Sequence, residues 1–178
     1  MALKPQDVCV VLKIAAGGSP RPSYSRLATE LAMSPSEVHA SVKRAQASGL
    51  LHGPAFGERP NYAALEEFLL HGLRYVFPAE RGEMTRGVAT SYGGPPLRGQ
   101  IAPTDEPIPV WPCAEGSQRG LALTPLYRGA PEAALRDESF YELLVLVDAL
   151  RDGRVRERRI AEAELHRRLR KGQRANES

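Results

Sequence analysis

The run Ser34-Pro35-Ser36-Glu37 constrains the fold of this chain more than any other local feature, because it fixes where a helix begins. A serine accepts hydrogen bonds from free N–H groups at a helix start, and a proline suits the first helical position. A glutamate three residues after the serine completes a capping box. Gly49 is the left-handed residue expected just past the end of this helix. The pattern therefore predicts a helix over residues 35–48.

Two further helices are predicted before this one. Residues 5–16 and 24–32 each carry apolar side chains at helical spacing, and two glycines follow the first of them. In the second, Ala28 is small at a point where two helices must cross closely. Only a short turn separates this helix from the capping box. The N-terminal third of the chain is thus expected to hold three helices in close succession.

The stretch from residue 24 to residue 51 resembles the helix-turn-helix core of winged-helix bacterial transcriptional regulators of the MarR-like group. The features that match are Leu27-Ala28, Leu31, Ala32, Met33, Ser34, Val38, Val42 and Gly49-Leu50-Leu51. The resemblance extends over about residues 5–62 if the helix over 5–16 precedes the motif and residues 50–62 form a wing. It implies an N-terminal winged helix-turn-helix domain that binds duplex DNA and regulates transcription.

The helix over 35–48 is expected to present one face to the core and the opposite face to DNA. The outer face has short side chains near its start and cations further along, so it suits a major groove. Arg59 lies in the predicted wing, where it either reaches a phosphate or minor groove or is a solvated loop cation. The candidate DNA-contacting residues are Ser34, Ser36, His39, Ala40, Lys43, Arg44 and Arg59.

The middle of the chain is rich in proline and glycine, and most of the fifteen prolines lie there. A loop of this length in a compact domain is usually functional or mobile. Two pieces, 108–111 and 121–123, are candidates to pair as short strands. We therefore divide the chain into a winged helix-turn-helix domain (1–62), a connecting helix (63–77), a Pro/Gly-rich segment (78–131), a C-terminal helical region (132–171) and a frayed tail (172–178).

Residues 139–150 are apolar nearly all round, which predicts a central, buried helix. Such a helix must be covered on every side. A second copy of the chain would cover it, and we therefore expect a homodimer that forms through the C-terminal helices, residues 139–170. The alternative is a monomeric second domain in which Trp111, Leu121 and Leu126 pack against this helix.

The last helix, expected over 154–171, is strongly charged. Residues 151–174 hold ten Lys or Arg against four acids. This segment either lies along a DNA backbone or is an amphipathic helix laced with salt bridges, since Glu157, Glu162 and Glu164 interleave with its arginines.

Charge and composition limit which other classes of function the chain can have. A net charge of +3 and a pI near 9.0 permit an acidic partner such as nucleic acid without demanding one. No apolar run approaches the roughly 18 residues of a membrane helix, and the N-terminus makes a poor signal peptide. Two cysteines give no disulfide framework, and the four histidines have no metal spacing. We expect a cytoplasmic protein with no cofactor and no metal.

The sequence as a whole predicts a mainly α protein: an N-terminal winged helix-turn-helix, then a loop-rich segment and C-terminal helices. The function expected is a transcriptional regulator that binds duplex DNA through residues 35–48. The alternative is a protein-interaction module, such as an antitoxin-like partner protein that docks through its winged helix. An enzyme with its site in residues 78–131 is not expected, because nothing there assembles an acid, a base and a nucleophile.

Overall fold

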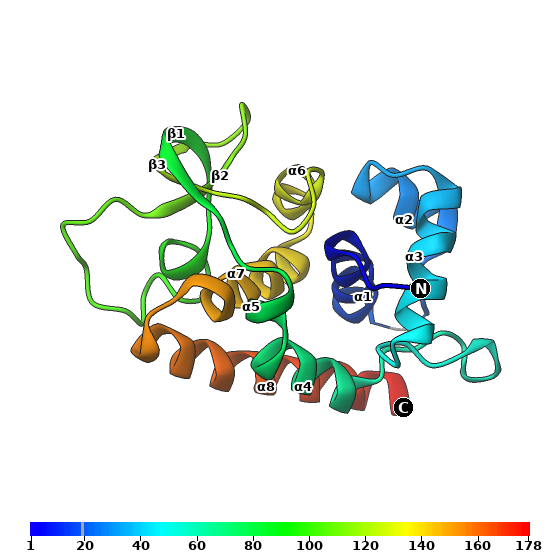
Figure 1. The fold of residues 1–178 in the computed structure, drawn as a ribbon. Coiled ribbons are helices and arrows are strands. Elements are labelled where there is room, and N and C mark those ends of the chain that lie inside the picture. Colours follow the sequence, from blue (N-terminus) through cyan, green and yellow to red (C-terminus); the bar gives the residue numbers. More distant parts are fainter. Residues whose placement is uncertain (19) are drawn as a thin grey trace.

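The computed structural model describes residues 1–18 and 20–178, apart from the side chain of Phe56. This part of the chain is mainly helical and carries one small sheet (Figure 1). The helices are α1 (Pro5–Gly17), α2 (Tyr24–Leu31), α3 (Pro35–Ala47), α4 (Tyr62–His71), α5 (Leu73–Val76), α6 (Ala130–Leu135), α7 (Glu138–Asp152) and α8 (Val155–Glu177). Two single turns of 3-10 helix are η1 (Pro54–Phe56) and η2 (Ser91–Gly93), and the strands are β1 (Arg81–Ala89), β2 (Pro109–Pro112) and β3 (Gln118–Leu123).

The helices α1, α2 and α3 occupy the predicted ranges to within one residue at each end. Helix α1 is the most enclosed of them. It lies between α3 on one side and α7 on the other, and residues 8–12 have no exposed surface (Figure 1). The N-terminal helices therefore share one hydrophobic core with the C-terminal helices.

Helix α7 is buried on all sides, as its sequence predicts, but the same chain covers it. The elements α1, α5, α6, α8 and η2 pack against it. Trp111 and Leu126 belong to the same core, as the monomeric alternative expects, whereas Leu121 is only half-buried and lies outside it. The argument that a second copy must cover this helix is therefore wrong. A homodimer stays a prediction without that support.

The three strands form a small closed sheet within the segment expected to be loop. β1 pairs antiparallel with both β2 and β3, and β2 pairs with β3 in parallel. The two predicted strand pieces lie in or overlap β2 and β3, whereas β1 was not predicted. Glycine is required where the strands approach most closely: a Cβ on Gly87 would lie 1.9 Å from the carbonyl oxygen of Trp111.

A buried polar cluster ties this sheet to α7. The carboxylate of Asp148 accepts hydrogen bonds from the hydroxyl of Thr90 at 2.7 Å and from the indole N–H of Trp111 at 2.6 Å. It also pairs with the guanidinium of Arg151 at 2.9 Å, and Arg151 in turn donates to the carbonyl of Phe77. Every member of the cluster has a partner, as buried polar groups require.

Two later segments of the structure differ from what the sequence predicts. The connecting helix expected over 63–77 is interrupted at Gly72, where a Cβ would come within 3.0 Å of the Phe68 ring. The tail expected to fray over 172–178 is helical to Glu177. It is held because the Asn176 side-chain amide donates to the Tyr62 hydroxyl, while Arg59 donates to the Asn176 carbonyl at 2.9 Å.

Candidate nucleic-acid interface

The junction between α2 and α3 is a tight turn built by local sequence. Ala32 adopts the left-handed conformation (φ 53°), and the Met33 N–H donates to the Ala28 carbonyl at 2.9 Å. The predicted capping box then starts α3: the Ser34 N–H donates to the Glu37 carboxylate at 2.7 Å, and the Glu37 N–H donates to the Ser34 hydroxyl at 3.2 Å. The angle between the two helices is thus fixed by bonds at the turn itself.

A distant part of the chain supports the same turn. The hydroxyl of Tyr127 donates to the Ala32 carbonyl at 3.1 Å, and the Tyr127 ring is buried. Two residues later, Gly129 passes so close that a Cβ there would lie 2.5 Å from the Leu31 carbonyl oxygen. The segment before α6 therefore holds the α2–α3 turn from outside.

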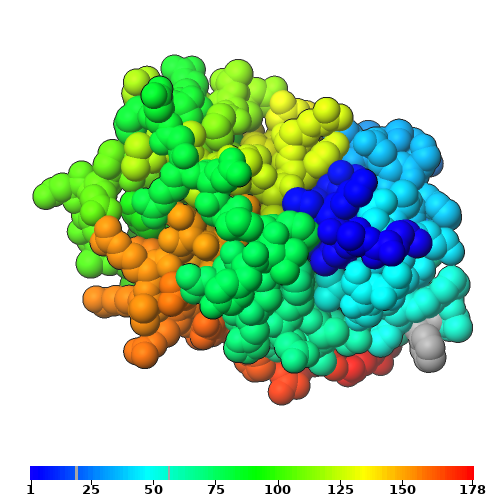
Figure 2. Space-filling view, in the orientation of Figure 1, coloured from blue at the N-terminus to red at the C-terminus, as the bar shows by residue number. Residues whose placement is uncertain are grey.

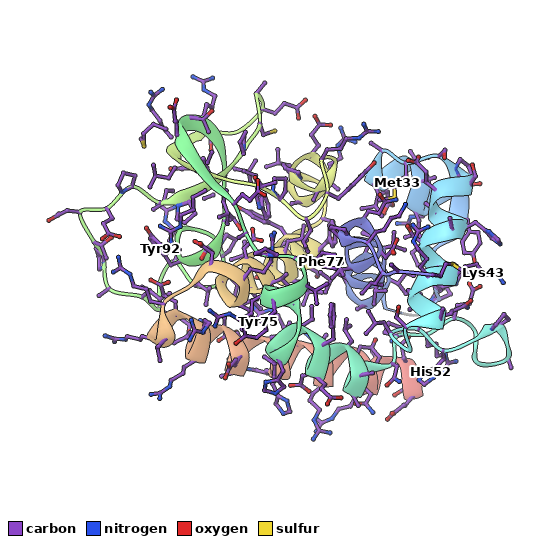
Figure 3. All side chains as sticks on the ribbon, viewed as in Figure 1. Met33, Lys43, His52, Tyr75, Phe77 and Tyr92 are labelled. Atoms are coloured by element: carbon purple, nitrogen blue, oxygen red, sulfur yellow. The ribbon has the colours of Figure 1, made fainter. Side chains whose placement is uncertain are left out.

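Helix α3 has the two faces that the sequence predicts. Its buried side is Val38, Ser41, Val42 and Ala45. On the other side Ser36, His39 and Lys43 are exposed, and Ala40 is half-buried. Lys43 lies on the outer surface of the molecule and makes no ion pair with any other residue that the structure describes (Figure 3). The His39 ring packs edge-on against Tyr24, with the ring centroids 5.8 Å apart.

Arg44 does not lie on this outer face as a free cation. Its guanidinium forms two hydrogen bonds, each 2.8 Å long, with the carboxylate of Asp7, which is fully buried. This bidentate pairing raises the pKa of Arg44 and joins α3 to α1. Arg44 therefore holds the helix in place, and its predicted phosphate contact has no free guanidinium to make it.

The loop after α3 is short, and backbone hydrogen bonds hold its two ends together. An isolated antiparallel bridge joins Leu51 to Pro60, and the His52 N–H donates to the Arg59 carbonyl at 2.8 Å. Near the loop tip, Glu58 accepts a hydrogen bond from the Tyr24 hydroxyl at 2.6 Å and pairs with Arg21 at 3.0 Å. Burial and the Glu58 carboxylate raise the pKa of Tyr24 to about 12.

Arg59 is exposed, but it is bonded to the C-terminal helix. Its guanidinium donates to the Asn176 carbonyl at 2.9 Å, which leaves its other N–H groups accessible. The loop that carries Arg59 and the end of α8 therefore lie side by side (Figure 1).

Sequence reasoning missed one cation beside α3. Arg128 is exposed, lies between Tyr127 and Gly129, and lowers the pKa of Glu37 in the first turn of α3, next to the larger effect of the hydrogen bond from the Ser34 N–H. No local signal could have placed it there, because it is about ninety residues away in sequence and reaches the site only through the fold.

Comparison of the chain with protein-family models, curated proteins and solved structures finds no match. The site is therefore interpreted from its own geometry. Within residues 1–18 and 20–178, no group of three His, Cys, Asp or Glu side chains is placed to hold a metal ion. No helix in the same part of the chain is both long and apolar enough to cross a membrane.

Proposed function

We propose that this chain is a transcriptional regulator that binds duplex DNA, with α1, α2, α3 and the loop bridged at Leu51 and Pro60 acting as a winged helix-turn-helix. The observation that carries the proposal is the outer face of α3. No other part of the described chain covers this face. Its first residues have short side chains, and further along it bears Lys43 as a free cation.

In this mechanism α3 enters a major groove with its N-terminal turn foremost. Ser36, His39 and Ala40 are then nearest the base edges, where short side chains let the helix approach closely. Lys43 meets a phosphate of the flanking backbone, and Arg59 contacts the backbone from the loop. Arg44 contributes by fixing α3 on α1 through Asp7.

The test is the salt dependence of binding to duplex DNA. Lys43→Gln should weaken binding on all sequences and lower the slope of log Kobs against log salt by about 0.9, the value expected when one phosphate is no longer neutralised. Arg119→Gln is the matched control, because it removes the same charge from β3, away from α3. A Lys43→Gln protein with unchanged slope and affinity would take α3 out of the interface.

A second candidate function is docking to another protein, in the manner of an antitoxin-like partner. It is favoured by the apolar side chains that α5 leaves exposed: Tyr75 is 76% exposed and Val76 is 55% exposed. Figure 3 places Tyr75 well apart from Lys43. A charge reversal at Lys43 therefore separates the two functions, because it should weaken binding to DNA and leave docking through α5 unchanged.

A further inference from the structure

Helix α8 presents an almost continuous stripe of arginine to solvent. Every member of the stripe is exposed, and spacings of three, four and eight residues keep all of them on one face of the helix. Ala163 lies on the same face between Arg159 and Arg167 and interrupts the stripe. The arginines are Arg156, Arg159, Arg167, Arg170 and Arg174. From first to last the stripe spans about 27 Å, at 1.5 Å per residue.

Among the residues that the structure describes, the acids of α8 pair with only one arginine of this stripe. Glu164 is buried at the flank of the stripe, where it pairs with Arg168 and with one member of the stripe, Arg167. Glu157 accepts a hydrogen bond from the Arg154 N–H at 2.8 Å and so caps the helix start. The salt bridges that the sequence allows for this helix therefore form around Glu164 and leave most of the stripe unpaired.

Most cations of the stripe are left without a counter-charge. Within the described part of the chain, no ion pair or hydrogen bond involves the side chain of Arg156, Arg159, Arg170 or Arg174, nor that of the neighbouring Lys171. Because like charges repel at this spacing, such a face is stabilised by an external anion.

The stripe is held rigidly and runs up to the proposed DNA-binding surface. Helix α8 packs along α7 and α4, and its last turn is fixed to Tyr62 by Asn176. The Asn176 carbonyl accepts the hydrogen bond from Arg59, so the C-terminal end of the stripe lies against the loop that follows α3 (Figure 1). Figure 2 shows this last part of the chain at the lower rim of the molecule, beneath the residues of that loop and of α4.

We propose that the arginine stripe of α8 is a second contact surface for the phosphate backbone of duplex DNA, next to the stretch bound by α3. This inference rests on the proposed function. Guanidinium groups match phosphate oxygens in two-pronged hydrogen bonds. A membrane surface fits less well, because the exposed face carries no aromatic or leucine side chains that could insert between lipids.

The experiment compares two triple variants on a random-sequence duplex of about 30 base pairs, between about 50 and 200 mM salt. Arg159→Gln/Arg170→Gln/Arg174→Gln removes three unpaired cations of the stripe. Arg86→Gln/Arg98→Gln/Arg119→Gln removes three exposed arginines of the sheet and its connecting loop, with the same change in net charge. The stripe variant should lower the log–log salt slope by about 0.9 for each phosphate that it no longer neutralises, up to about 2.7, and the control should leave it unchanged.

The outcomes separate this inference from the proposed function. If wild type and the stripe variant have equal slopes while Lys43→Gln still lowers the slope, the stripe does not contact DNA. In that case α3 remains the DNA-binding element. A slope that is reduced in the stripe variant but not in Lys43→Gln would support the stripe as a DNA contact and exclude α3 from the interface. Binding of wild type, but not of the stripe variant, to phosphatidylglycerol vesicles, with equal DNA affinities, would assign the stripe to a membrane and overturn the inference. Circular dichroism checks that each variant is folded.

Discussion

At the scale of single residues, Tyr127 decides how firmly the α2–α3 turn is held. Its hydroxyl donates to the carbonyl of Ala32 from a buried ring. Tyr127→Phe leaves that carbonyl without its partner and should lower the free energy of unfolding by about 1 kcal/mol, measured by urea denaturation. Tyr75→Phe, at a residue 76% exposed, should have no effect. Equal urea midpoints for both variants would mean that the bond adds nothing to stability.

Arg44 has a partner, Asp7, that sequence reasoning did not predict. The Asp7 carboxylate is fully buried and accepts two hydrogen bonds from Arg44. Asp7→Asn leaves the guanidinium facing a neutral amide, and breaking such a pair costs about 3–5 kcal/mol. Thermal unfolding should show this destabilisation, and adding Arg44→Met should recover part of the stability. A double variant no more stable than Asp7→Asn alone would show that the two side chains act independently.

At the scale of elements, the capping box makes the start of α3 sensitive to acid. The hydrogen bond from the Ser34 N–H holds the pKa of Glu37 below its usual value. A carboxyl with a lowered pKa in the folded state stabilises the protein above its unfolded pKa, about 4.3, and this stabilisation is lost as the pH falls through the folded value. Wild type should therefore be more stable than Glu37→Gln at pH 7 and lose that advantage near pH 3.

The matched control for this pH experiment is Glu67→Gln, a change at an exposed residue of α4. Its stability relative to wild type should stay the same at both pH values. A difference between Glu37→Gln and wild type that is equally large at pH 7 and pH 3 would contradict the role given to the carboxylate.

Helices with local sequence signals could be predicted, whereas strands that depend on contacts with distant parts of the chain could not. Helices α2 and α3 carry caps and a regular apolar stripe, so their ends follow from the sequence. Strand β1 begins with exposed, mostly polar residues and contains Gly82 and Gly87. Its sequence therefore lacks the alternation of apolar and polar residues that predicts a strand. Its pairing depends instead on how closely its backbone approaches Trp111, more than twenty residues further along the chain.

The candidate site divides in the same way. That Lys43 is exposed follows from the period of α3 alone. The partners of Arg44 and Arg59 do not, because Asp7 lies 37 residues away in sequence and Asn176 lies 117 residues away. Periodicity gives the face of a helix on which a cation lies, but long-range packing decides whether that cation is free to bind a phosphate.

At the scale of the whole molecule, the N-terminal helices are bound into a single core. Helix α1 contacts α3 with one side and α7 with another, and its buried apolar residues belong to the same core as those of both helices. An N-terminal fragment would expose the side that faces α7 to water. At roughly 25 cal/mol per Å² of apolar surface, that exposure removes much of the stabilisation on which a short chain depends.

The last prediction is therefore that residues 1–62 do not fold alone. A fragment of that length should show reduced helix content, bind the dye ANS and unfold without a sharp transition. The full chain should unfold in one transition, with coincident curves from far-ultraviolet circular dichroism, which follows the helices, and from fluorescence of Trp111, its single tryptophan. A cooperative melt of the fragment, or a Trp111 transition separate from that of the helices, would show instead that the N-terminal helices form an independent domain.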